Sequence, residues 1–160
     1  MLIEFIAALA ISSLIGIIVT IMNAQILNQT SSNNNFTMAS RQTMNALHWI
    51  SRDVQMAQTI NGTDDFPQSD SLVLTWKTWD NTVHTANYTL EDDLLTRSYV
   101  IGSGSPSVLL VARYINPAED MTNCTSDNGV LTLTITSSVG EGSKVVNVTK
   151  SHQISSRPNI

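Results

Sequence analysis

Residues 5–22 read FIAALAISSLIGIIVTIM, an apolar run of eighteen residues in which only Ser12, Ser13 and Thr20 are polar. Each of these hydroxyl groups can bond back to a carbonyl of its own helix, so the run remains compatible with lipid. Roughly 20 helical residues, at a rise of about 1.5 Å each, span a hydrocarbon core of about 30 Å. The run therefore predicts a membrane-spanning helix near the N-terminus.

A cleaved secretory signal peptide is the alternative explanation of this run. Such a signal needs a basic segment before a shorter apolar core and a small-residue cleavage site after it. Neither feature is present, and Glu4 is acidic where the basic segment would stand. We therefore expect a retained membrane helix.

The distribution of charge separates this segment from the rest of the chain. Between Glu4 and Arg41 there is no Asp, Glu, Lys or Arg in 36 consecutive positions, and only 13% of the 160 residues are charged. A soluble domain averages about 25%, which argues against an ordinary soluble enzyme. The net charge is −5 and the eight Lys and Arg form no run, so neither a nucleic-acid-binding surface nor a polybasic membrane patch is predicted.

Cysteine usage excludes three further features. Because Cys124 is the single cysteine, the chain can form no intramolecular disulfide, no CxxC redox motif and no Cys-based metal site.

Glu4 lies at the edge of the apolar helix. An isolated carboxylate carried into lipid without a partner costs several kcal/mol. The helix dipole favours a negative charge in the first turn, and the nearest available cation is an α-amino terminus. Alternatively, Glu4 lies in the headgroup layer and needs no partner.

Residues 2–11, LIEFIAALAI, resemble the mature N-terminus of type IV pilins and type II secretion pseudopilins. In that family a prepilin peptidase removes a short basic leader after a glycine. The new N-terminus, often N-methylated, precedes a Leu-Ile-Glu segment and a long apolar helix. The resemblance covers about residues 1–25. The family's glutamate is usually the fifth mature residue and here it is the fourth, so either a residue is missing or the register differs.

The resemblance implies a structural subunit of a type IV pilus-like or pseudopilus filament. Apolar helices would bundle in the filament core, with the heads outside, and each subunit would be a single-pass membrane protein before assembly and extracellular afterwards. The implied partners are further copies or other pilins and the inner-membrane assembly machinery. The implied assembly residues are Glu4, Met1 and Gly16: the Glu4 carboxylate pairs with a neighbour's terminal amine, and Gly16 allows close helix packing. Such filaments serve adhesion, motility, DNA uptake, secretion or electron transfer.

The chain changes character after this helix. Residues 28–35, NQTSSNNN, are all polar and compete with the backbone for hydrogen bonds, so we expect a break or stretched turn within residues 22–36. An apolar stripe with steps of three and four then predicts an amphipathic helix. The stripe consists of Phe36, Ala39, Thr43, Leu47, Ile50, Val54 and Ala57. The pair Asn61-Gly62 predicts the end of this helix.

A β-rich head is predicted for residues 63–160. Six stretches are rich in Val, Leu, Ile, Thr and aromatic residues. They are residues 71–76, 83–90, 94–101, 108–115, 130–136 and 144–149. Short connections, with no second helical period, favour antiparallel pairing.

The predicted fold class is therefore α+β, with a long N-terminal hydrophobic helix packed by its C-terminal half on a small antiparallel sheet. Three segments follow along the chain. They are a membrane or filament-core helix over residues 1–27, a polar interruption and amphipathic helix over 28–62, and the head over 63–160.

Two further stretches resemble the minor-pilin and J-type pseudopilin group. Residues 47–57, LHWISRDVQMA, are similar to its segment in which an Arg-Asp pair precedes an Ala near the helix end, and residues 156–159, SRPN, are similar to its Arg-Asn tails. With one cysteine, the disulfide-bounded C-terminal loop of some pilins cannot form. The rival hypothesis is a single-pass membrane protein whose extracytoplasmic β domain binds a ligand or acts as an enzyme without polymerising.

No catalytic residue, cofactor or metal ligand is predicted. His48, His84 and His152 lack metal-ligand spacing and lie near no nucleophile signature, and His48 is expected on the helix surface. The acidic groups at residues 64–70, 91–93 and 119–127 lack the glycine and terminal glutamate of an EF-hand.

Glycosylation sequons are more frequent than chance. About three are expected from the composition, and six occur, at Asn28, Asn35, Asn61, Asn87, Asn123 and Asn147. They mark either glycosylated positions or an exposed surface rich in Asn and Thr, and both explanations favour an extracytoplasmic head.

Overall fold

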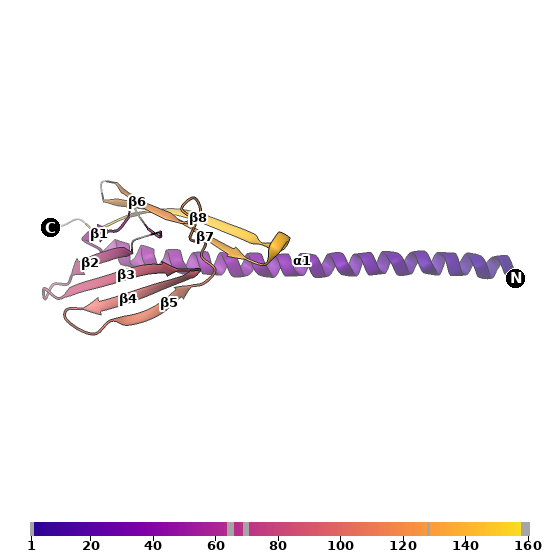
Figure 1. Ribbon diagram of the computed structural model, residues 1–160, viewed down its shortest axis with the longest axis horizontal. Coiled ribbons are helices and arrows are strands. Elements are labelled where there is room, and N and C mark those ends of the chain that lie inside the picture. The colour runs from indigo at the N-terminus through magenta and orange to yellow at the C-terminus, as the bar shows by residue number, and fades with distance from the viewer. Residues whose placement is uncertain (1, 64–65, 69–70, 128, 158–160) are drawn as a thin grey trace.

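The computed structural model describes residues 2–63, 66–68, 71–127 and 129–157. One long helix, α1 (Leu2–Met56), is followed by strands in the head, which confirms the α+β fold (Figure 1). The strands are β1 (Thr59–Asn61), β2 (Leu72–Lys77), β3 (Val83–Glu91), β4 (Leu94–Ile101), β5 (Ser107–Ala112), β6 (Asn123–Asp127), β7 (Val130–Val139) and β8 (Val146–Ser155).

The strands form two antiparallel sheets rather than one. Strands β1 to β5 make a five-stranded meander in chain order, and β6, β7 and β8 make a three-stranded sheet. The C-terminal half of α1 lies between the two sheets and contacts β7, β8, β5 and β2 (Figure 1). The helix is therefore the middle layer of the head.

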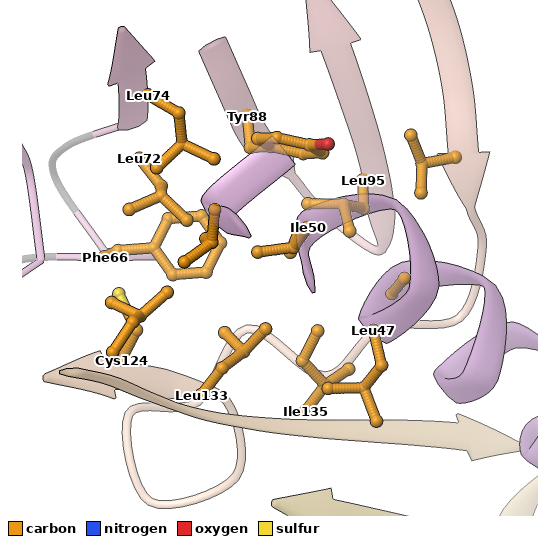
Figure 2. Close-up of a cluster of buried hydrophobic side chains, with 14 of the residues drawn as sticks. Leu47, Ile50, Phe66, Leu72, Leu74, Tyr88, Leu95, Cys124, Leu133 and Ile135 are labelled. Carbon is orange, nitrogen blue, oxygen red and sulfur yellow. The ribbon is translucent and has the colours of Figure 1, made fainter. Parts of the chain in front are cut away.

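The core follows from two periodicities that meet at this layer. Strand β7 alternates buried Leu131, Leu133 and Ile135 with half-buried threonines, as the sequence pattern predicted. Figure 2 shows Leu47 and Ile50 of α1 between the side chains of the five-stranded sheet and those of β7. Because α1 packs against a sheet on each side, the side chains that face the two sheets must be mostly apolar.

The stripe begins later than the sequence predicted. Its members from Ala39 to Ala57 are buried, whereas Phe36 is 55% exposed. Phe36 lies about one turn before Ala39, the first buried member. It has the spacing of the stripe, but it lies outside the core.

The expected break within residues 22–36 is also wrong, because α1 is continuous from Leu2 to Met56. The polar side chains find partners that leave the helical backbone intact. Thr30 Oγ1 donates to the Ile26 carbonyl at 2.9 Å. Lys144, in the β7–β8 connection, donates through Nζ to Asn28 Oδ1 at 3.0 Å, and its carbonyl accepts from Asn35 Nδ2 at 3.4 Å. The β7–β8 connection therefore lies along α1 and hydrogen-bonds to both ends of the polar segment, residues 28–35.

The helix ends at Met56 and not at the predicted Asn61-Gly62. The Gln58 amide donates to the Thr75 carbonyl at 2.9 Å, so the chain joins the edge of β2 at once. Gly62, with φ of +78°, turns the chain after β1, where a Cβ would collide with the Ser71 carbonyl. The Asn-Gly signal therefore ends a strand.

Each of the six predicted stretches contains a strand, but β1 and β6 were not predicted. Their sequences, TIN and NCTSD, carry too few apolar residues to give a strand signal. The stretch predicted at residues 144–149 begins instead with a 3₁₀ turn, and β8 continues to Ser155.

Candidate functional site

The N-terminal part of α1, residues 3–27, projects away from the strands of the head (Figure 1). Its large apolar side chains are exposed along the whole of residues 3–27, from 50% at Val19 to 79% at Ile3. By length and composition α1 can cross a membrane, and the apolar window that decides this is not buried at all within the chain. Exposed apolar surface of this extent is typical of a region that contacts a membrane or another protein.

The hydroxyl groups of this half bond back to the helix as the sequence predicted. Ser12 donates to the Ala8 carbonyl, Ser13 to the Ala10 carbonyl and Thr20 to the Gly16 carbonyl, each at 2.8 Å. These side chains therefore present no unsatisfied donor to an apolar surrounding.

Two of the predicted assembly residues, Glu4 and Gly16, lie in this exposed N-terminal part of α1. Glu4 lies in the first turn of α1 with its side chain exposed. A Cβ built on Gly16 would meet nothing within 4 Å, so no contact in the described part of the chain requires glycine there. Met1 lies outside the described residues, and the pairing of Glu4 with a terminal amine stays a prediction.

A buried ionic cluster attaches the other half of α1 to the five-stranded sheet. The Asp53 carboxylate accepts hydrogen bonds from Arg97 Nε at 2.6 Å and Arg97 Nη2 at 3.1 Å, and from the Tyr88 hydroxyl at 2.6 Å. The Arg97 and Asp53 side chains are only 11% and 1% exposed. The cluster thus joins α1 to β3 and β4 by charge-assisted hydrogen bonds.

Aromatic rings complete the surroundings of this cluster. The Arg97 guanidinium lies 4.4 Å from the ring centre of Tyr99 and 5.3 Å from that of Trp49. Burial raises the pKa of Tyr88, and its hydrogen bond to Asp53 raises it further. Burial alone would lower the pKa of Arg97, but the hydrogen bond and charge of Asp53 outweigh it and the net shift is upward. Arg97 therefore stays charged and Tyr88 stays a donor, which makes the cluster a fixed clamp.

The sequence interpretation missed this clamp, although a signal existed. Asp53 follows Ile50 by three residues and so lies on the buried face of the helix, and Arg97 is two residues after buried Leu95 in β4. Each is a charged residue at a position whose pattern predicts burial, and together they form a charge pair.

The histidines serve separate local contacts. His48 is exposed on α1, as expected. His84 Nδ1 lies 2.6 Å from the Tyr99 hydroxyl, and His152 Nδ1 lies 3.4 Å from Ser51 Oγ. Asp64, Asp65 and Asp70 fall outside the described residues. Within the described ranges no group of three His, Cys, Asp or Glu side chains is placed to hold a metal ion.

The six sequon asparagines differ in their surroundings. Asn28, Asn35 and Asn123 use their amides in hydrogen bonds to Lys144 or to the Glu119 carbonyl, and Asn87 Oδ1 is buried. Asn61 and Asn147 are exposed on β1 and β8. The geometry favours these two as acceptors for a glycan.

Comparison with known proteins identifies no relative: the chain matches no protein-family model, no curated protein and no solved structure.

Proposed function

We propose that this protein is a structural subunit of a type IV pilus-like or pseudopilus filament, and that it polymerises through its N-terminal helix. The observation that carries the proposal is the division of α1. One continuous helix is buried in the head over its C-terminal half and bare over its N-terminal half. Because the helix is continuous, packing of its N-terminal half in a filament core would also fix the position of the head.

The exposed half of α1 is suited to two successive surroundings. Large apolar side chains occur on every side of the helix and none is covered by the head, which is typical of a helix enclosed by lipid or by other helices. Exchanging lipid for neighbouring helices involves little hydrophobic transfer, so packing decides the association. Small residues at Ala7, Ala8, Ala10 and Gly16 allow helices to approach closely.

Gly16 supports contact between subunits in particular. Glycine in a helix interior costs about 1 kcal/mol relative to alanine, and none of the residues that the structure describes approaches the position. A neighbouring helix in the filament supplies the reason for it.

Glu4 has the central role in assembly under this proposal. Its carboxylate, buried among apolar helices, pairs with the terminal amine of a neighbouring subunit. Removing one partner of a buried pair leaves an uncompensated charge and costs about 3–5 kcal/mol. The carboxylate thereby sets the register of each added subunit.

The surroundings of the subunit follow from its resemblance to pilins. It is a single-pass protein of the cell membrane before assembly and part of an extracellular filament afterwards. Its partners are further copies or other pilins, the inner-membrane assembly machinery and the prepilin peptidase. The clamp residue Asp53 belongs to the Arg-Asp pair that is similar to the minor-pilin and J-type pseudopilin group.

A second candidate function is a single-pass membrane protein whose head binds a ligand without polymerising. A hollow of about 860 Å³ at the far end of the head favours it.

The experiment that separates the two is recovery of sheared surface filaments from cells carrying Glu4→Gln. This substitution keeps the shape of the side chain and removes its charge. We expect filament yield to fall severely, while total protein on a blot, membrane insertion and the melting of the head are unchanged.

Glu91→Gln is the matched control, because it removes an exposed carboxylate on the head and should leave filament yield normal. Normal yield with Glu4→Gln would mean that Glu4 is a headgroup-level residue, and the non-polymerising protein would be the better hypothesis.

A further inference from the structure

The end of the head opposite the N-terminus holds a hollow formed by three distant segments. The β2–β3 turn, the chain that leaves α1 and the segment after β8 meet there (Figure 1). The hollow measures about 860 Å³, within the range of sites for small ligands, about 300–1,000 Å³. Its lining includes Trp76, Lys77, Trp79 and Arg157.

Trp79 is the most unusual residue of this lining. Its side chain is 98% exposed, more than any other large apolar side chain in the described residues. Burying an aromatic ring of this size is strongly favourable, and tryptophan is highly buried on average. Among the described residues of the head, almost nothing covers the indole.

The turn that carries Trp79 is held rigidly. The Thr78 amide donates to the Thr82 carbonyl at 3.0 Å, and the Asn81 amide donates to the Thr78 carbonyl at 3.0 Å. The Asp80 carboxylate accepts from Thr78 Oγ1 at 2.6 Å and from the Thr82 amide at 3.1 Å. These bonds, with that from Thr78 the largest cause, lower the pKa of Asp80 to about 2. The backbone that carries the indole is therefore fixed at this end of the head.

Two cations, Lys77 and Arg157, line the same hollow as Trp79, and hydrogen bonds fix the backbone at each of them. The Lys77 amide donates to Gln58 Oε1 at 3.0 Å, and the Arg157 amide donates to the Ala57 carbonyl at 3.0 Å. None of the lining residues is acidic, and the nearby Asp80 carboxylate is engaged within its own turn. The described lining thus carries two positive charges and no negative one, on a chain of net charge −5, while the charged Asp80 carboxylate lies in the adjacent turn.

These groups match the chemistry of one ligand class. The apolar face of a pyranose ring stacks on an exposed indole, and its hydroxyl groups pair with short polar side chains such as Thr59 and Asn81. A carboxylate on the ring pairs with a lysine or arginine. We propose that this hollow binds an acidic oligosaccharide, with one sugar ring stacked on Trp79 and a carboxylate held by Lys77 and Arg157.

A nucleic acid would also use stacking and cations, but the charges disfavour it. Binding of a densely charged backbone requires a basic track along several phosphates. The chain is acidic overall and its eight Lys and Arg form no run. Two cations suit a saccharide with isolated carboxylates.

The test uses the full chain in detergent micelles, titrated with trigalacturonate and followed by tryptophan fluorescence and calorimetry. We expect saturable binding that weakens about ten-fold or more in Trp79→Ala and is largely retained in Trp79→Tyr. Lys77→Gln and Arg157→Gln should each weaken binding several-fold. Lys150→Gln, which removes an exposed cation on β8, is the matched control and should bind normally.

Four results would overturn the proposal. They are no saturable binding up to about 10 mM, a weak limit for a specific site; equal binding by Trp79→Ala; equal binding of the neutral methyl ester; and tighter binding of oligothymidylate than of trigalacturonate. Because the measurement is made on single subunits, it is independent of filament assembly.

Discussion

The two halves of α1 have the same backbone geometry and opposite surroundings. Residues 3–27 expose nearly every large apolar side chain, whereas Leu47, Ile50 and Val54 are buried between two sheets. The buried half also carries a charge, Asp53, and satisfies it within the chain. The large apolar side chains of residues 3–27 are not covered by the head. A helix can thus be complete as secondary structure while half of its surface has yet to be covered.

The largest effect we predict follows from separating the halves. A chain that starts at Asn28 should be a soluble monomer with a β-rich circular dichroism spectrum, because most of the exposed apolar surface precedes that residue. The full chain should require detergent. Sedimentation and circular dichroism of both chains measure this, and an aggregated or unfolded short chain would contradict the division into helix and head.

Breaking the clamp should cost the next largest amount. Asp53→Ala leaves the Arg97 guanidinium buried without its carboxylate and should lower the free energy of unfolding of the head by about 3–5 kcal/mol. Chemical denaturation in mild detergent, followed by near-ultraviolet circular dichroism, measures the loss. Gln55→Ala, at an exposed position two residues later, should stay within about 0.5 kcal/mol. Equal effects would show that the clamp contributes nothing.

A matched pair of substitutions compares the halves directly. Ile50→Ala opens a cavity in the core and should destabilise the head by about 2–5 kcal/mol. Ile15→Ala removes the same atoms from a side chain that is 56% exposed and should leave the head's unfolding unchanged. The same denaturation experiment reads both, and a large effect of Ile15→Ala would mean that the bare half stabilises the head.

The stability of residues 28–35, at the boundary between the two halves of α1, should depend on Lys144. Lys144→Ala removes the donor to Asn28 Oδ1 and should lower the local opening free energy of residues 28–35 by about 0.5 kcal/mol, as expected for an exposed hydrogen bond. Amide hydrogen exchange across this segment measures the change, with Lys150→Ala as control. Unaltered exchange would show that the helix holds this segment unaided.

The smallest effect is confined to the head and depends on pH. The pKa of Asp80 is lowered from 3.8 to about 2, so its stabilisation of the β2–β3 turn is complete above 3.8 and is lost as the pH falls through about 2. Thr78→Val removes the main hydrogen bond and should raise the pKa of Asp80 toward its ordinary value. Carboxyl NMR titration tests this. Thr132→Val on β7 should leave the pKa unchanged, and an unshifted value in Thr78→Val would refute the assignment.

Some features of the head followed from local patterns. The alternation of Leu131, Leu133 and Ile135 predicted β7 because a strand shows its two faces within a few residues. The short polar strands β1 and β6 have no such pattern, because their place depends on the edge of a neighbouring strand. The helix end at Met56 was missed for the same reason, since it is set by the bond of Gln58 to Thr75.

The candidate sites divide in the same way. Glu4 and Gly16 were proposed from a resemblance to pilins that lies in one contiguous stretch of sequence, and their role in assembly stays a prediction. The Asp53–Arg97 clamp was not, since its partners are 44 residues apart. The hollow at the far end combines Thr59, Trp79 and Arg157, whose proximity no local pattern indicates.

The sequence by itself determined the long apolar helix, its amphipathic continuation and the strand-rich head, because periodicity and charge content act over neighbouring residues. Only the tertiary structure decided that the helix continues through residues 28–35, that it lies between two sheets and that Asp53 meets Arg97 and Tyr88. Those outcomes depend on side chains that the chain brings together from distant positions. Lys144 is one example: it bonds to Asn28 across 116 residues, and its contribution exists only once β7 and β8 have paired.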